Sequence, residues 1–163
     1  MVTVRLAKLT CEELEENMES LIGVYEKAYR DLPEYGYHER ERIRGYLSWL
    51  WRGDPAGFLV ALDRERIAGF ISVHGEWEEG GEIIGEIHEF VVDPEYQARG
   101  VGNILFRAAL QYAQRKGRTR IGLWVGEKNR KAIEFYVRRG FQKKEQKGKW
   151  IRMSREVKYP ESA

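Results

Sequence analysis

The most informative stretch of this 163-residue chain is Gln97-Ala98-Arg99-Gly100-Val101-Gly102-Asn103. It follows a predicted strand that ends at Val92 and opens a predicted helix. Backbone N–H groups at a helix start form an anion site, and glycines let a phosphate approach the main chain. No third glycine follows at the dinucleotide-binding spacing, and no Gly-Lys-Ser/Thr follows as in a P-loop. The stretch therefore predicts a phosphate ligand of another kind, with a plain glycine-rich helix start as the alternative.

A strand and two helices are predicted before this stretch. Apolar residues alternate over 2–6, which predicts a short strand. Thr10 and Glu13 form a capping-box pattern at the start of a helical periodicity over 11–30. A second helical periodicity over 43–50 predicts another helix.

An antiparallel meander, two more helices and further strands complete the prediction. The full order is β-αα-βββ-α-β-α-ββ, which predicts an α/β (α+β) fold: a mixed, mostly antiparallel sheet of about seven strands with helices on both faces. The predicted strands are 57–62, 66–73, 83–92, 121–125, 141–145 and 150–157, and the predicted helices cover about 100–116 and 132–139.

Two motifs in the expected order resemble those of the GNAT superfamily of N-acetyltransferases. Residues 97–102 match its acetyl-CoA pyrophosphate loop, Gln/Arg-x-x-Gly-x-Gly/Ala. Its second signature matches Asn129, Ala132, Tyr136 and Gly140-Phe141. The resemblance covers roughly residues 57–141. It implies a single N-acetyltransferase domain over 1–163 that uses acetyl-CoA as co-substrate and no metal.

The resemblance also implies which residues bind acetyl-CoA. The strand before the loop splays from its parallel neighbour at a bulge in this family, and its exposed backbone pairs with the pantetheine arm. Asn129 matches a cofactor-contacting Asn, although an N-cap is an equally good interpretation of an Asn there. The implied cofactor-binding residues are Phe90, Val91, Val92, Gln97, Ala98, Arg99, Gly100, Val101, Gly102, Asn103 and Asn129.

Tyr136 matches the position of a tyrosine that, in many family members, protonates the departing CoA thiolate. A phenol with a pKa near 10 is a competent proton donor to a thiolate held beside it. The alternative is an aromatic side chain on the inner stripe of its helix. Tyr136 is therefore the predicted general acid.

A general base is also expected, because an amine acceptor must lose a proton before it attacks the thioester. Glu86 and His88 fall where histone-type and serotonin-acetylating members carry a catalytic Glu and His. Strand alternation without a bulge puts both on one face with Phe90 and Val92, and puts Glu89, the reserve candidate, on the other. Ribosomal-protein acetyltransferases carry a Glu where this chain has Trp124, which argues against their mechanism.

The predicted reaction is direct attack of a primary amine on the thioester. The amine could belong to a protein N-terminus, a lysine or a small molecule. By resemblance, the segment between the first two helices roofs the acceptor pocket and offers Tyr35 and Tyr37 as contacts. One alternative is a non-catalytic acyl-CoA sensor. The other is a nucleic-acid surface on the lysine-rich segment 142–150, which is disfavoured because such hairpins usually form solvated sheet edges.

Acidic and basic residues are unevenly distributed between the two parts of the chain. Residues up to Ala98 hold 10 basic and 21 acidic residues, whereas those from Arg99 hold 18 basic and 5 acidic. The basic half contains the predicted CoA loop, so the acidic half is expected to receive a cationic amine. The single cysteine, the lack of a long apolar run and the lack of a secretory h-region predict a cytoplasmic protein with no membrane partner. No nucleic-acid partner is expected either, since the lysine-rich segment is interpreted as a sheet edge. The Glu- and Arg-rich composition indicates a thermophilic source, and the family resemblance allows a homodimer through the last strands.

Overall fold

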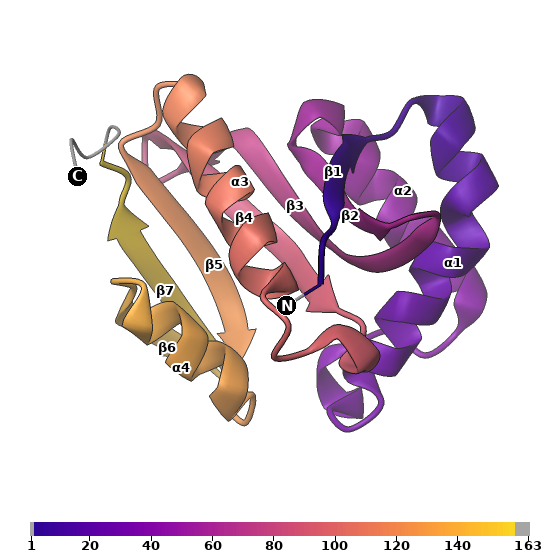
Figure 1. Ribbon diagram of the computed structural model, residues 1–163. Coiled ribbons are helices and arrows are strands. Elements are labelled where there is room, and N and C mark those ends of the chain that lie inside the picture. Colours follow the sequence, from indigo (N-terminus) through magenta and orange to yellow (C-terminus); the bar gives the residue numbers. More distant parts are fainter. Residues whose placement is uncertain (1, 159–163) are drawn as a thin grey trace.

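A computed structural model describes residues 2–158 as a seven-stranded sheet with helices on both faces (Figure 1). The strand order is β1-β2-β3-β4-β5-β7-β6, and all neighbours are antiparallel except the parallel pair β4 and β5. The strands are β1 (Arg5–Lys8), β2 (Phe58–Asp63), β3 (Arg66–Glu79), β4 (Glu82–Val92), β5 (Arg120–Gly126), β6 (Gln142–Lys147) and β7 (Trp150–Glu156).

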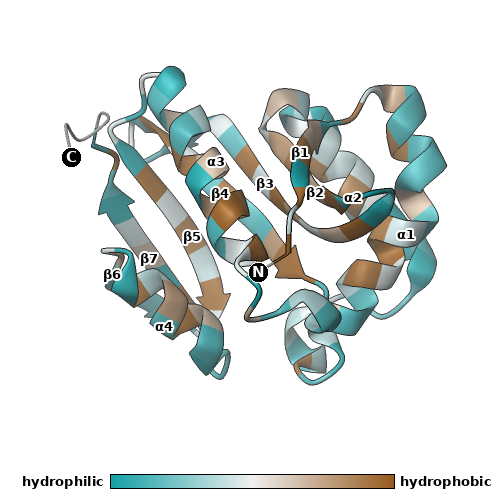
Figure 2. Ribbon diagram, in the orientation of Figure 1, coloured by the Kyte–Doolittle hydropathy of each residue, from teal (hydrophilic) through white to brown (hydrophobic). Residues whose placement is uncertain are grey.

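Two helices cover each face of the sheet. Helices α1 (Cys11–Tyr29) and α2 (Arg40–Gly53) bury their apolar stripes against one face, and α3 (Val101–Arg115) and α4 (Arg130–Arg138) cover the other. Alternation along β2 divides the core, because Phe58 and Val60 pack toward α1 and α2 while Leu59 packs toward α3. In Figure 2 the hydrophobic residues lie along the central strands, whereas the edge strand β6 is hydrophilic.

The predicted order of elements is confirmed, and local signals explain much of it. The capping box of α1 is formed: the Glu13 amide donates to Thr10 Oγ1 over 3.1 Å, and the Thr10 amide donates to Glu13 Oε1 over 2.9 Å. Strand β3 is longer than predicted and runs to Glu79, from which Gly80 and Gly81 turn the chain into β4 with positive φ angles of 57° and 84°. Among residues 2–158 no helix is long and apolar enough to cross a membrane.

Strand β4 contains a bulge that the alternation pattern did not predict. Ser72 of β3 pairs with Glu89, but the next residue, Val73, pairs with Ile87, so His88 is an extra residue in β4. Ile87 therefore faces the α3 and α4 side, as Phe90 does. The family resemblance implied a bulge in this strand, and Glu86 and His88 do share a face as expected, but the expectation that Phe90 and Val92 share it was wrong. Glu89 lies on the α1 and α2 face instead, together with Glu86 and His88.

The parallel pairing of β4 with β5 ends at the same place. Only Gly85, Glu86 and Ile87 pair with β5, opposite residues 121–123. Beyond Ile87 the two strands diverge, and the edge of β4 from His88 to Val92 has no strand partner on its β5 side within the described part of the chain. This splay opens the sheet between its two halves.

Candidate active site

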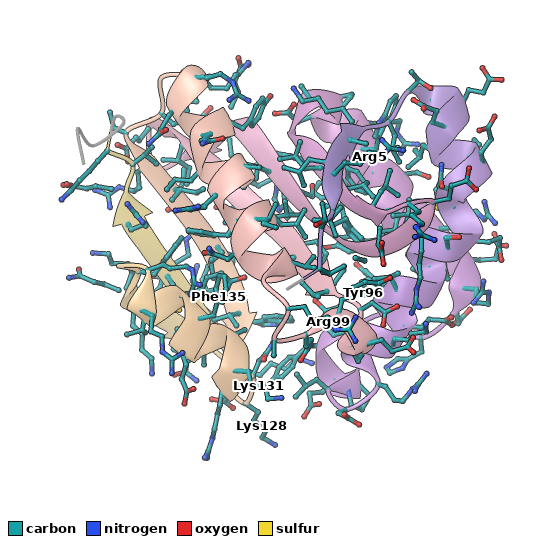
Figure 3. All side chains as sticks on the ribbon, viewed as in Figure 1. Arg5, Tyr96, Arg99, Lys128, Lys131 and Phe135 are labelled. Carbon is teal, nitrogen blue, oxygen red and sulfur yellow. The ribbon has the colours of Figure 1, made fainter. Side chains whose placement is uncertain are left out.

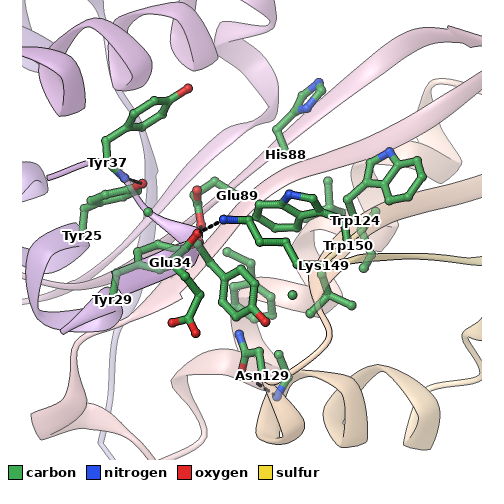
Figure 4. A pocket seen from close by; sticks show the side chains of 18 of the residues that line it. Tyr25, Tyr29, Glu34, Tyr37, His88, Glu89, Trp124, Asn129, Lys149 and Trp150 are labelled. Atoms are coloured by element: carbon green, nitrogen blue, oxygen red, sulfur yellow. Dashed lines mark hydrogen bonds between the residues drawn. The ribbon is translucent and has the colours of Figure 1, made fainter. Parts of the chain in front are cut away.

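A pocket of about 640 Å³ lies at the splay of β4 and β5 (Figure 4). Its walls come from segments far apart in the sequence: α1, the segment after it, both diverging strands, α4 and the β6–β7 turn. The fold brings together here five of the predicted catalytic and cofactor-binding residues, namely Glu86, His88, Phe90, Asn129 and Tyr136. The reserve candidate Glu89 and the predicted acceptor contacts Tyr35 and Tyr37 line the same pocket.

The predicted phosphate loop has the geometry of an anion site. Ala98 and Gly100 both adopt left-handed backbone conformations, with φ angles of 62° and 86°, and Gly100 is the N-cap of α3. Among the described residues no hydrogen-bond acceptor faces the backbone amides from Ala98 to Asn103. Successive free amides in such a turn, at the positive end of a helix, attract anions. Arg99, labelled in Figure 3, lies at this loop with its guanidinium 5.6 Å from the Tyr96 ring centroid.

Gly102 supports a ligand at this loop. A Cβ added to it would lie 3.7 Å from Phe90 and from Val92 and 3.8 Å from Phe135, which are ordinary van der Waals distances. Its φ angle is not positive, so the protein itself does not need glycine here. The remaining reason for a glycine at position 102 is that a ligand approaches the main chain closely.

Asn129 serves as the N-cap of α4 and also faces the pocket. Its side-chain oxygen accepts a hydrogen bond from the Ala132 amide over 3.3 Å, and Figure 4 shows the side chain at one end of the pocket. The two interpretations of this residue are therefore compatible, since capping uses the oxygen and leaves the amide NH₂ group.

Tyr136 lies on the inner face of α4 and lines the pocket. It is 6% exposed, and among the described residues its hydroxyl has no hydrogen-bond partner. Burial and the nearby charge of Glu89 raise the pKa of Tyr136 well above its usual value. The hydroxyl therefore stays protonated at ordinary pH and can serve as a proton donor.

Glu89 is the buried carboxyl group of the pocket. Tyr29 of α1 donates a hydrogen bond to one oxygen, and Tyr46 of α2 donates to the other over 2.8 Å. Burial raises the pKa of Glu89, and the two hydroxyls only partly offset the shift. The Glu89 carboxyl can therefore change its protonation state nearer to neutral pH than an exposed glutamate.

Glu86 is held in a buried ion pair. Both of its oxygens accept hydrogen bonds from the Arg152 guanidinium, over 2.6 and 2.7 Å, and the two residues are each 3% exposed. Arg152 also contacts Glu79 over 2.6 Å. This geometry engages both oxygens of Glu86 and is that of a structural pair across β4 and β7.

The His88 ring packs among other rings. Its centroid lies 4.2 Å from that of His74, 4.5 Å from Trp77 and 5.1 Å from Trp49. Figure 4 shows the ring pointing away from Glu89 and Asn129. Burial, together with the charges of His74 and Arg152, lowers the pKa of His88 to about 3. A ring with so low a pKa is a weak proton acceptor.

Aromatic and charged residues close the rim of the pocket. The Tyr35 hydroxyl accepts a hydrogen bond from the Lys128 amide over 3.0 Å, and the Tyr35 ring lies 5.2 Å from that of Trp150. Lys149 Nζ donates to the Glu34 carbonyl oxygen, as the dashed line in Figure 4 shows. These contacts connect the segment after α1 to the β6–β7 turn.

The sequence analysis did not identify two residues of this wall, Tyr25 and Tyr29. Both matched the inner stripe of a helix, where aromatic side chains usually belong to the core. Their hydroxyls could have identified them as site residues, because a buried tyrosine usually hydrogen-bonds a polar partner. Tyr25 accepts a hydrogen bond from the Tyr37 amide over 2.9 Å, and Tyr29 binds Glu89.

Comparisons with known sequences agree with this geometry. An uncharacterized N-acetyltransferase of Methanocaldococcus jannaschii is 37% identical over 144 residues, which are 87% of this chain. A mycothiol acetyltransferase of Geodermatophilus obscurus is 35% identical over 119 residues, or 71% of this chain. The chain spans only 64% and 38% of the lengths of these two relatives.

Solved structures show the same fold. The crystal structure of the protein PH1933 from Pyrococcus horikoshii OT3 matches with a TM-score of 0.87 and 36% identity, over 96% of this chain and all of that one. The PaiA N-acetyltransferase of Thermoplasma acidophilum, solved in complex with coenzyme A, matches with a TM-score of 0.75 and 22% identity, over 95% of this chain and 99% of that one. The model of the acetyltransferase (GNAT) family matches residues 18–141, so this chain belongs to the GNAT acetyltransferase family.

Proposed function

We propose that this protein is an acetyl-CoA-dependent N-acetyltransferase that transfers the acetyl group to a primary amine by direct attack on the thioester. One observation carries the proposal. The splay of β4 from β5 creates a pocket that contains a free strand edge, a protonated buried phenol and a buried carboxyl group, with the free amides of the α3 loop at the same end of β4.

The residues present fit coenzyme A. The amides from Ala98 to Asn103, with Arg99 beside them, would hold the pyrophosphate. The free edge of β4 at Phe90, Val91 and Val92 offers main-chain groups to an extended arm, while the side chains remain packed in the core. The Asn129 NH₂ group is available at the far end of the pocket. Acetyl-CoA would supply the acetyl group as a thioester.

Tyr136 would act as the general acid. As the amine nitrogen forms its bond to the carbonyl carbon, the carbon–sulfur bond would break and the sulfur would take the proton of the Tyr136 hydroxyl. The nitrogen would then lose its extra proton to solvent, and solvent would return a proton to the Tyr136 phenolate. The raised pKa of Tyr136 ensures that the proton is present. Holding both reactants in one pocket supplies the larger part of the acceleration.

Glu89 is our choice for the general base, in place of Glu86 and His88. Glu86 is held in an ion pair with the Arg152 guanidinium, whereas the side-chain partners of Glu89 are neutral hydroxyls. The His88 ring points away from Glu89, and its pKa is about 3. Glu89 lies in the pocket and its pKa is raised toward neutrality. It would accept the proton of the incoming ammonium directly or through a water molecule.

A cationic acceptor fits the walls around Glu89. The Tyr25 ring lies 4.7 Å from that of Tyr29 and 6.0 Å from that of Tyr46, and the hydroxyls of Tyr29 and Tyr46 bind the Glu89 carboxyl group. An ammonium group gains from both a carboxylate and aromatic faces. Much of the acidic charge of α1 is already paired, since Glu19 and Glu26 bind Arg40. The attraction for a cation therefore comes from Glu89 more than from the surface.

The test is thiol release from acetyl-CoA with a panel of primary amines, for the chain as it stands and for two variants. Tyr136→Phe is expected to lower kcat by about 100-fold or more where chemistry limits the rate. Tyr96→Phe is the matched control, because it removes a phenol bonded to Asp63 outside the pocket. Full turnover by Tyr136→Phe would refute the acid assignment. Tight CoA binding without turnover of any amine would support the sensor instead.

A further inference from the structure

A second cavity, of about 560 Å³, adjoins the active-site pocket on the α2 side. We call it the aromatic groove, and its lining residues are Tyr37, Arg42, Gly45, Tyr46 and Trp49. The exposed surface inside it is predominantly apolar. Nothing in the acetyl-transfer chemistry described above uses it.

The aromatic groove is continuous with the active-site pocket, because Tyr37 and Tyr46 line both. The Tyr46 hydroxyl reaches Glu89 over 2.8 Å in the first pocket. The Tyr46 ring lies 5.2 Å from Tyr37 and stacks at 6.4 Å with Trp49 in the second. In a molecule whose amine lies at Glu89, the part beyond the amine could therefore reach the groove by passing the Tyr46 ring.

The groove holds large aromatic side chains in contact with solvent. Tyr37 and Trp49 are 44% and 43% exposed, among the highest values for large apolar side chains in the described residues. Exposed aromatic side chains gathered around a cavity, rather than scattered, mark a binding site. Arg42 at the rim makes no ion pair among residues 2–158 and would repel a second positive charge on the ligand.

Gly45 leaves clearance in the aromatic groove. It lies inside α2, where glycine lowers helix stability relative to alanine. A Cβ added to Gly45 would meet no protein atom within 4 Å, so packing does not require glycine here. The open space beside it belongs to the groove, and a side chain would fill part of that space.

We propose that the acceptor amine carries a neutral apolar group, aromatic by preference, which binds in the aromatic groove while the amine lies at Glu89. The inference rests on the proposed function and specifies its substrate class. Tyr37, Tyr46 and Trp49 provide the apolar walls, and Gly45 provides the clearance. Polyamines are disfavoured because their second ammonium group would lie near Arg42.

Three probe amines of similar basicity test the proposal: butylamine, 4-phenylbutylamine and 1,4-diaminobutane. The ratio of kcat/KM for 4-phenylbutylamine to that for butylamine is expected to be about 10 or more, since even one buried methylene group gives a factor of this order. 1,4-Diaminobutane is expected to be no better than butylamine. A ratio near 1, with both amines turned over, would overturn this inference alone. Absence of turnover with every amine would overturn the proposed function, and this inference with it.

Gly45→Ala is the decisive variant, and Gly23→Ala is its matched control. Gly23 is also a glycine inside a helix, α1, with no protein atom within 4 Å of an added Cβ, but it lines neither cavity. Both variants are expected to raise Tm by about 1 to 4 °C through helix propensity. Only Gly45→Ala is expected to lower the ratio of kcat/KM for 4-phenylbutylamine to that for butylamine, by about fivefold. A ratio that both variants leave unchanged would contradict the groove as the binding site.

Discussion

Replacement of Arg152 by Met is expected to lower the free energy of unfolding by about 3 to 5 kcal/mol, because it leaves a buried carboxylate without its partner. Glu86 is 3% exposed and loses two hydrogen bonds of 2.6 and 2.7 Å. At this chain length each kcal/mol corresponds to about 2 to 4 °C, so Tm should fall by about 6 to 20 °C. Glu86→Gln is expected to cost less, since Arg152 keeps its contact with Glu79.

The loss should depend on pH with a definite sign. Burial already raises the pKa of Glu86 in the folded protein, and removal of the Arg152 guanidinium raises it further above the unfolded value of about 4.3. Such a carboxyl group destabilises the fold once it must ionise, so the penalty is largest at alkaline pH and shrinks as pH falls toward the unfolded pKa. Thermal unfolding of the chain and of Arg152→Met at pH 5 and pH 8 measures this. An equal Tm difference at both values would refute the reasoning.

The double variant Glu86→Gln/Arg152→Met separates structure from catalysis. It replaces the pair by uncharged groups, so it should recover much of the stability that Arg152→Met loses. It should also retain acetyl transfer if Glu86 only supports the fold. A double variant with restored Tm and intact CoA binding, but without turnover, would show that Glu86 is the base after all.

Two further variants test the site itself. Glu89→Gln is expected to lower kcat by about 100-fold or more, with little change in CoA affinity measured by calorimetry. In the unchanged chain, the raised pKa of Glu89 should place the acidic limb of the kcat/KM profile at a higher pH than an ordinary glutamate would. An unchanged kcat in Glu89→Gln would exclude Glu89 as the general base. Gly102→Ala should fold normally, as its Cβ meets only ordinary contacts, yet weaken CoA binding by about 10-fold; equal affinity would remove the argument for close phosphate approach.

Much of the architecture could be predicted because local signals and the global fold agree. The Thr10 capping box, the periodicity of the helices and the glycines of the 97–102 loop each act over a few residues, and each forms as predicted. The loop also predicted where the proposed CoA side of the site lies. The wall around Glu89 could not be predicted in this way, because Tyr29 and Tyr46 reach it from two helices, across about 60 and 43 residues of chain.

The bulge at His88 explains why the candidate base was the weakest prediction. A one-residue change in register moves all following side chains to the opposite face, so simple alternation cannot assign both ends of β4. The extra residue lets Glu86 meet Arg152 and lets Glu89 meet Tyr29 and Tyr46 on the same face. It also coincides with the end of pairing to β5. In a regular strand Glu86 and Glu89, three residues apart, would face opposite sides of the sheet, so the bulge that puts both carboxyl groups on the α1 and α2 face lies where β4 leaves β5 and the pocket opens.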